Sequence, residues 1–437
     1  MSSGSQDVGF RRAIEALRNG VPNADAVRVL GSNQESVEQL FLERLAAVED
    51  AARVGRQIEG LLVKGGFGTG KSHLLKYLQV KAISENFVCS HIVISKETPM
   101  FNPAKVYRAA IEAARGPRLS GQAIKEIALG LRQDTQPYAE LYKWASGADS
   151  GVHQLFPATL ILHERLRNDP ELVEKITNFW SGDSLKIADV KHGLRQIRAA
   201  ATFDLKGKVP ASLALERFSF AARLILGAGY KGWVLLIDEV ELVGRFNVVE
   251  RGKSYAELAR WLGKSERTNY QGILAVAAIT DDFDLAVLQG KGDRDSIGPR
   301  LRSKGTEEFN MLASEAETGM RIIEREALTL APPGDSVLDQ TYRKLKDIHA
   351  RAYDWEPPDV ESGNKDSKRA MRSWVRRWIN EWDLRRLYPE ASVNTEEQVL
   401  KPTYEEDRDL KESSDGDQTS GDSPEQLSEQ DAGSVSG

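Results

Sequence analysis

Residues 65–72 read GGFGTGKS and satisfy the pattern G-x-x-x-x-G-K-[ST]. This run is suited to phosphate binding, because its glycines let several backbone N–H groups converge on a chain of phosphates. Lys71 would reach the β- and γ-phosphates of a nucleotide, and the Ser72 hydroxyl would bind Mg²⁺. ATP and Mg²⁺ are the predicted ligands, and the predicted nucleotide-binding residues are Gly65, Gly66, Phe67, Gly68, Thr69, Gly70, Lys71, Ser72 and His73.

A second chemical signal is the apolar run VLLI at residues 234–237, which ends in two acids. We expect Asp238 to hold the Mg²⁺ shell at the carboxyl end of a buried strand. Glu239 would polarise the attacking water as a general base. Glu241 is less suited to that role, because it is expected on the other side of the turn. A solvated acidic turn is the alternative reading, although the upstream phosphate loop argues against it.

Thr280 follows the apolar run ILAVAAI at residues 273–279. A polar residue at the end of a strand beside the acidic pair could position the lytic water, and we assign this sensor role to Thr280. The alternative is a hydroxyl that caps the next helix.

Two groups of arginines could stabilise charge on the γ-phosphate. Arg300 and Arg302 follow the sensor strand, where one could reach the site of a neighbouring subunit, or both could be surface arginines. Arg369 and Arg372 begin a helix in which Met371, Val375, Trp378 and Trp382 form an apolar stripe. Either arginine could act from a lid over the nucleotide. The same basic face could instead be plainly solvated, or it could contact nucleic acid.

These residues require a scaffold of alternating strands and helices. Apolar runs near residues 60–64, 87–95, 233–237 and 273–279 alternate with helical patterns, which predicts an α/β fold with a parallel sheet covered on both faces. The predicted divisions are an N-terminal helical segment (1–57) packing on the nucleotide site, an ATPase core (58–313) with a helical insertion (about 113–215), a helical lid (314–395) and a disordered acidic tail (396–437).

The charge distribution is uneven along the 437 residues. Residues 403–437 carry eleven acids and two bases, a net charge of −9, so the overall charge of −6 leaves about +3 on the rest of the chain. The apolar runs are too short for a membrane span, and the beginning of the chain has no signal-peptide character. The single cysteine, Cys89, is expected to be a buried strand thiol, and we expect a cytoplasmic protein.

The order of phosphate loop, acidic pair, polar sensor, late arginines and helical lid resembles an AAA+ P-loop ATPase of the initiator-like branch, over about residues 58–390. A narrower resemblance, to the ATP-binding proteins of BREX-type phage-defence systems, lies in residues 11–23 (RRAIEALRNGVPN), 56–60 (RQIEG) and 346–355 (KDIHARAYDW). It implies a bacterial ATPase that works with other defence proteins. By analogy, the turn at residues 20–23 would form part of the adenine pocket. AAA+ proteins often carry Asn at the sensor position, where this chain has Thr280.

The first functional hypothesis is therefore an Mg²⁺-dependent ATPase that remodels or loads protein–DNA complexes in phage defence. Other defence proteins, double-stranded DNA and further copies of the chain are its expected partners. The alternatives are a slow nucleotide-gated scaffold that recruits partners, and a replication-initiator-like DNA-binding ATPase. The acidic tail could compete with DNA for a basic face.

Overall fold

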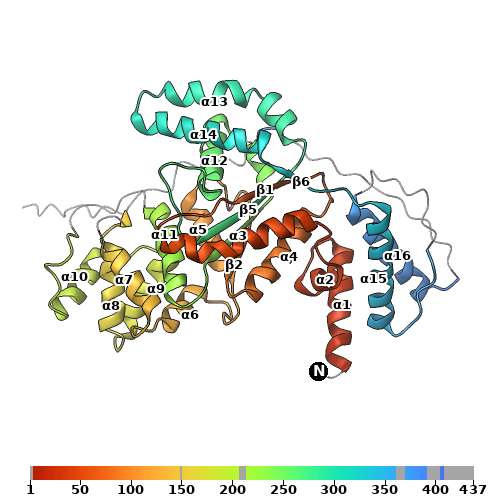
Figure 1. The fold of residues 1–437 in the computed structure, drawn as a ribbon, viewed down its shortest axis with the longest axis horizontal. Coiled ribbons are helices and arrows are strands. Elements are labelled where there is room, and N and C mark those ends of the chain that lie inside the picture. Colours follow the sequence, from red (N-terminus) through yellow and green to blue (C-terminus); the bar gives the residue numbers. More distant parts are fainter. Residues whose placement is uncertain (1–2, 148–149, 206–212, 361–369, 391–403, 408–437) are drawn as a thin grey trace, which may run out of the picture.

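The computed structural model describes residues 3–147, 150–205, 213–360, 370–390 and 404–407. At its centre lies a six-stranded sheet with the strand order β3-β2-β4-β5-β1-β6 (Figure 1). All neighbouring strands are parallel except the antiparallel pair β2 and β3. The strands are β1 (Leu61–Lys64), β2 (Val88–Val93), β3 (Ala114–Arg115), β4 (Trp233–Asp238), β5 (Ile273–Ile279) and β6 (Leu328–Thr329).

Helices make up most of the remaining described chain. They are α1 (Ser3–Asn19), α2 (Ala24–Leu30), α3 (Glu35–Arg53), α4 (Lys71–Ser84), α5 (Pro103–Glu112), α6 (Ala123–Gly130), α7 (Gln136–Ser146), α8 (Leu155–Arg165), α9 (Pro170–Ser181), α10 (Ile187–Gln196), α11 (Leu213–Gly227), α12 (Val248–Trp261), α13 (Asp293–Arg302), α14 (Glu307–Arg325), α15 (Asp335–Tyr353) and α16 (Met371–Leu387). The 3₁₀ helix η2 (Val240–Arg245) follows β4, and the π-helix η3 (Asp284–Gln289) follows β5.

The sheet is buried on both faces, as its continuous apolar strands require. Successive side chains of a strand point to opposite faces. Leu235 and Ile237 therefore belong to a cluster with α5, α11 and α12, whereas Val234 and Leu236 pack with α3 and α4. Cys89 is buried on β2, as predicted. This double cover holds the strand ends, and the loops that follow them, in fixed relative positions.

The N-terminal helices pack against the last helices of the described chain. The buried faces of α1, α2, α15 and α16 form one apolar cluster that includes Leu17, Leu345 and Trp378, and these helices lie together at the right of Figure 1. Helix α1 ends at Asn19, as the Asn-Gly pair predicts, and Gly20 adopts a φ of +72°. Asn23 then caps α2, accepting a 2.8 Å hydrogen bond from the Ala26 backbone N–H.

Residues 314–325, which we expected in the lid, lie in α14 beside the core instead. This helix packs along α12 so closely that a Cβ on Gly319 would come within 1.9 Å of the Tyr255 carbonyl oxygen. Strand β6 then joins the sheet beside β1. The apolar face of α14, with Ala316 and Met320, is buried in the main core, and this burial explains its position.

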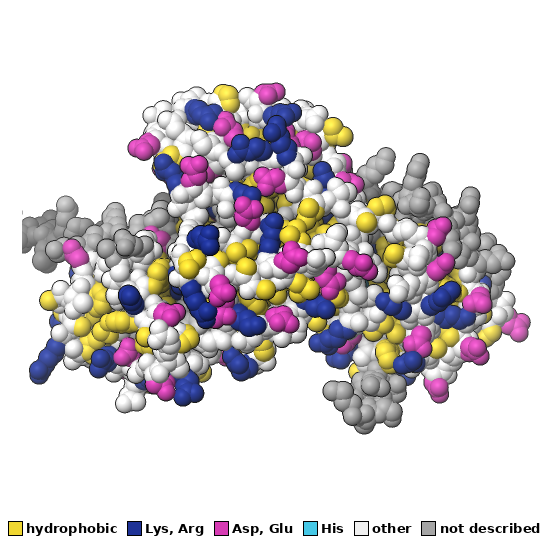
Figure 2. Space-filling view, viewed as in Figure 1, with side chains coloured by type: hydrophobic (Ala, Val, Ile, Leu, Met, Phe, Trp, Pro, Cys, Tyr) yellow, Lys and Arg dark blue, Asp and Glu magenta, His cyan; other side chains and the backbone are white. Residues whose placement is uncertain are grey.

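Helices α7 to α10 gather at the opposite end of the molecule from α15 and α16 (Figure 1). Acidic and basic side chains are interspersed over the face drawn in Figure 2. No described helix is both long and apolar enough to cross a membrane. Most of the acidic tail lies outside the described residues. Its residues 404–407, which we expected to be disordered, contact η2 and the loop after β5.

Candidate nucleotide-binding site

The glycine-rich loop joins β1 directly to α4. Gly68 and Gly70 adopt φ angles of +78° and +109°, which a residue with a Cβ rarely adopts. The Lys71 ammonium folds back over the loop and donates to the carbonyl oxygens of Gly65 (2.8 Å) and Gly66 (3.2 Å). The helix begins at Lys71, so its first N–H groups and its dipole face the space above the loop, an arrangement that suits a phosphate.

Asp238, at the carboxyl end of β4, is 4% exposed and reaches the start of α4. Burial raises the pKa of its carboxyl group, but the neighbouring His91 and Ser72 side chains outweigh this and hold the pKa below its usual value. The His91 Nε2 atom lies 3.6 Å from the carboxylate. Asp238 is therefore an ionised oxygen donor beside a hydroxyl oxygen, and this pair fits a hard divalent cation such as Mg²⁺.

Glu239 adopts a left-handed backbone conformation with a φ of +57°. This conformation is costly for a residue with a Cβ and turns the chain sharply after the strand. Burial, together with the charge of Asp238, raises the pKa of the Glu239 carboxyl group, whereas Lys71 and Arg372 lower it. The side chain lines the same cavity as Lys71 and Asp238, where a general base would be needed.

Thr280 follows β5, the strand between β1 and β4. It therefore lies between the phosphate loop and the acidic pair, and the neighbouring Asp281 approaches Gly66. The Thr280 side chain is 3% exposed, and its hydroxyl lies 2.7 Å from the Tyr404 hydroxyl.

Arg372 is the predicted arginine that the structure brings to the loop. Its backbone N–H donates to the Gly68 carbonyl oxygen (3.2 Å), and its Nη2 donates to the Gly20 carbonyl oxygen (2.6 Å). The guanidinium also lies 5.5 Å from the centre of the Phe67 ring. Arg369 lies outside the described residues.

A cavity of about 280 Å³ opens above these groups. One part is polar and is bounded by the loop, Asp238, Glu239 and Arg372. The other is largely apolar and comes from α1, α2, the turn between them, α15 and α16, through residues that include Leu17, Pro22, Leu30, Val337, Met371 and Val375. An apolar slot joined to a phosphate-binding end matches the two halves of a nucleotide.

His73 lines the cavity, and its Nε2–H donates a 2.8 Å hydrogen bond to the Gly31 carbonyl oxygen. Its burial lowers the pKa of the imidazole. The neutral ring would then donate this bond, which ties α4 to the turn after α2.

Arg300 and Arg302 do not line this cavity. Both lie near the end of α13, where they are exposed. The Arg302 guanidinium makes a bidentate ion pair with Glu317, with contacts of 2.6 and 2.8 Å.

Sequence reasoning misplaced one residue near the site, Glu241, and missed two, His91 and Tyr404. Glu241 lines the cavity with Glu239, because the 3₁₀ turn of η2 brings it back toward Lys71, and burial raises the pKa of its carboxyl group to about 7. His91 is placed by the pairing of β2 with β4. A tyrosine within an acidic run was the only sequence signal for Tyr404.

The comparison with known families agrees with this geometry. A family model described as "BREX system ATP-binding protein BrxC/D" matches residues 9–136 and 191–367, together more than half of the chain. The unmatched residues between these segments include α7 to α9. No curated protein and no solved structure matches the chain.

Proposed function

This chain belongs to the family of BREX system ATP-binding proteins, and from that premise we propose that it is an Mg²⁺-dependent ATPase of the phage-defence system. Membership of the family supports ATP binding and other defence proteins as partners. The observation that carries the step to hydrolysis is the convergence of Lys71, Ser72, Asp238 and Glu239 on one cavity.

The proposed mechanism is positioning combined with electrostatic stabilisation. Lys71 would exchange its two loop carbonyl contacts for oxygens of the β- and γ-phosphates. Ser72 and Asp238 would hold Mg²⁺, which neutralises charge developing on the phosphates. Glu239, whose pKa is raised, would orient the attacking water and accept its proton. Arg372 would add a positive charge from the lid.

We further assign the fold to the AAA+ type of P-loop NTPase, of the initiator-like branch. The support is the strand order, in which β5 separates the phosphate-loop strand β1 from the acidic strand β4. Thr280 follows β5 in this order, which supports the proposal that it acts as a sensor of the water or the γ-phosphate. The packing supports a lid of α15 and α16 that binds the N-terminal helices across the nucleotide.

In this proposal the protein works as a homo-oligomer in the cytoplasm and acts on protein–DNA complexes. An arginine of α13 would serve the neighbouring subunit's site. One observation favours the slower alternative, a nucleotide-gated scaffold: the Thr280 hydroxyl is already bound by Tyr404.

Replacing the loop lysine tests the nucleotide site. Lys71→Ala is expected to weaken Mg-ATP binding by at least about 100-fold, because the phosphates lose a charge-assisted partner. Lys143→Ala, at an exposed position on α7, is the control and should bind ATP as the wild type does. Titration with a fluorescent ATP analogue measures both affinities. Equal affinities in the two variants would mean that the cavity is not the ATP site.

A further inference from the structure

Residues Tyr404–Asp407 form a short strap that contacts the carboxyl-terminal side of the sheet. Two acids of this strap meet two arginines of the core. Asp407 pairs with Arg245 at 2.6 Å and donates its backbone N–H to the Arg245 carbonyl oxygen at 3.2 Å. Glu406 pairs with Arg251 at 3.0 Å. Backbone and side chains both take part, so the contact depends on more than charge.

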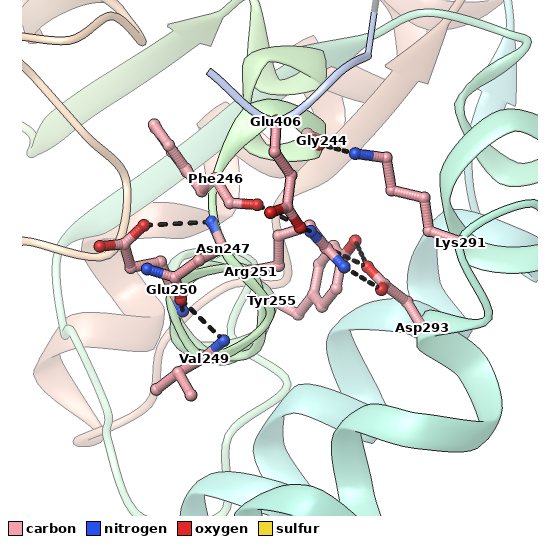
Figure 3. Close-up of polar contacts among 10 residues, drawn as sticks. All are labelled: Gly244, Phe246, Asn247, Val249, Glu250, Arg251, Tyr255, Lys291, Asp293 and Glu406. Atoms are coloured by element: carbon pink, nitrogen blue, oxygen red, sulfur yellow. Dashed lines mark hydrogen bonds and ion pairs between the residues drawn. The ribbon is translucent and has the colours of Figure 1, made fainter. Parts of the chain in front are cut away.

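The part of the core that the strap contacts is a buried polar network (Figure 3). Arg251 is 2% exposed, and its guanidinium is held by both oxygens of Asp293, at 2.7 Å each, and by the Phe246 carbonyl oxygen. Tyr255 donates a further hydrogen bond to Asp293 at 2.8 Å. Glu406 therefore meets a guanidinium that the core has already fixed in place, which lowers the entropy lost on docking.

Tyr404 reaches deeper than the two acids. Its ring packs edge-on against Phe283, with the ring centres 6.0 Å apart. Gly244 leaves room for it, since a Cβ there would come within 3.0 Å of the tyrosine ring. The Tyr404 hydroxyl donates to Asp282 at 2.8 Å and lies 2.7 Å from the Thr280 hydroxyl.

The number of protons decides what this contact does to Thr280. A tyrosine hydroxyl carries one proton, and a carboxylate can only accept. The Tyr404 proton is used on Asp282, so the bond between the two hydroxyls must use the proton of Thr280. Burial raises the pKa of the Tyr404 hydroxyl, so it stays protonated. While the strap is bound, the Thr280 hydroxyl therefore cannot donate a hydrogen bond to a phosphate oxygen or to a water molecule.

We propose that Tyr404–Asp407 is an inhibitory segment that binds the surface between η2 and the end of β5 and occupies the hydroxyl of Thr280. Release of the strap frees this hydroxyl for the nucleotide. The docking stands on the contacts alone, whereas its effect on turnover rests on the proposed ATPase function.

Hydrogen–deuterium exchange of the full chain tests the docking. The double variant Glu406→Gln/Asp407→Asn should exchange the backbone amides of residues 404–407 about tenfold faster than the wild type, since two ion pairs are lost. The control Glu412→Gln/Asp415→Asn removes the same charge from the same tail and should leave this exchange unchanged. Equal exchange in the wild type and both variants would overturn the docking.

Turnover tests the inhibition. Tyr404→Phe keeps the ring but removes the hydroxyl, so kcat should rise about fivefold, the equivalent of one hydrogen bond, with KM for ATP unchanged. In a Thr280→Val background the same change should have no effect. An unchanged kcat for Tyr404→Phe would overturn the inhibitory role. A third outcome is that residues 404–407 exchange more slowly in the wild type than in the double variant, while neither the wild type nor any variant hydrolyses ATP. That outcome would refute the ATPase and the inhibition but leave the docking established.

Discussion

At the scale of residues, the cavity contains two glutamates with different surroundings. Glu239 is exposed to the cavity, and Glu241 is largely buried behind it. Within the described chain, the Oε2 atom of Glu241 is buried and has no hydrogen-bond partner. Its ionised form is therefore poorly solvated, and Lys71 compensates only in part.

This burial predicts that Glu241→Gln stabilises the folded protein, by an amount that depends on pH. The usual pKa of 4.5 is raised to about 7 in the folded protein, so ionisation at higher pH favours the unfolded chain. Wild-type stability falls as the pH rises between these values, and the loss persists above them. At pH 8 the variant should be more stable by up to about 3 kcal/mol, and at pH 4 nearly equal.

Urea unfolding at both pH values measures this difference. Glu308→Gln, at an exposed position on α14, is the control and should change stability at neither pH. An identical stability for Glu241→Gln and the wild type at pH 8 would contradict the burial of this carboxylate.

The loop and the acidic pair were predictable from the sequence, because each consists of consecutive residues that form a recognisable motif. Glu241 was misplaced because its direction depends on the 3₁₀ geometry of η2 after the left-handed Glu239. Neither the 3₁₀ turn nor the left-handed backbone of Glu239 can be read from the local sequence. A positive φ is uncommon for residues other than glycine, and a glutamate gives no sign of it.

At the scale of elements, α16 couples the end of the described fold to the phosphate loop. Its first turn carries Arg372, which contacts Gly68 through the backbone and Gly20 through the guanidinium. A Cβ on Gly20 would come within 2.9 Å of the Arg372 Nε atom, so this glycine is required for the close approach as well as for its positive φ.

These contacts predict that Arg372→Lys weakens ATP binding about tenfold. The lysine keeps the charge, but it loses the planar fork and the stacking on Phe67. Arg376→Lys is the matched control on the exposed side of the same helix and should bind ATP normally. Nucleotide titration measures the ATP affinity of both variants. Equal losses of affinity would show that the effect belongs to the helix rather than to Arg372.

The parallel part of the sheet and its flanking helices were predictable, because apolar runs alternating with helical patterns leave few arrangements. The antiparallel strand β3 was not predicted, since its two residues carry no periodic signal. Nor was the position of α14. Its amphipathic pattern predicts a buried face but cannot say which surface covers it, and the contact with α12 is made possible by one glycine, Gly319. Strand β6 has two residues, too few for a periodic signal.

At the scale of the whole molecule, the proposed homo-oligomer would use an arginine of α13 at the site of a neighbouring copy. Neither Arg300 nor Arg302 lines its own cavity, and Glu317 engages Arg302 in a bidentate pair. Arg300 is therefore the better candidate for reaching the site of a neighbouring copy.

Arg300→Ala should lower turnover by about 10³, with ATP binding retained. Mixing this variant with Glu239→Gln should restore part of the activity, because each protein supplies what the other lacks at a shared interface. Arg302→Ala should have a much smaller effect. If mixtures stay as inactive as the separate proteins, Arg300 does not act on a neighbouring subunit.

We propose above all that this cavity binds and hydrolyses ATP. The most direct measurement is the steady-state ATPase rate of the wild type and of Glu239→Gln, with and without duplex DNA, alongside ATP binding by both. We predict that the variant binds ATP as the wild type does and loses turnover by about 10²–10⁴, the contribution of a general base. A Glu239→Gln protein that hydrolyses ATP at the wild-type rate would contradict the account.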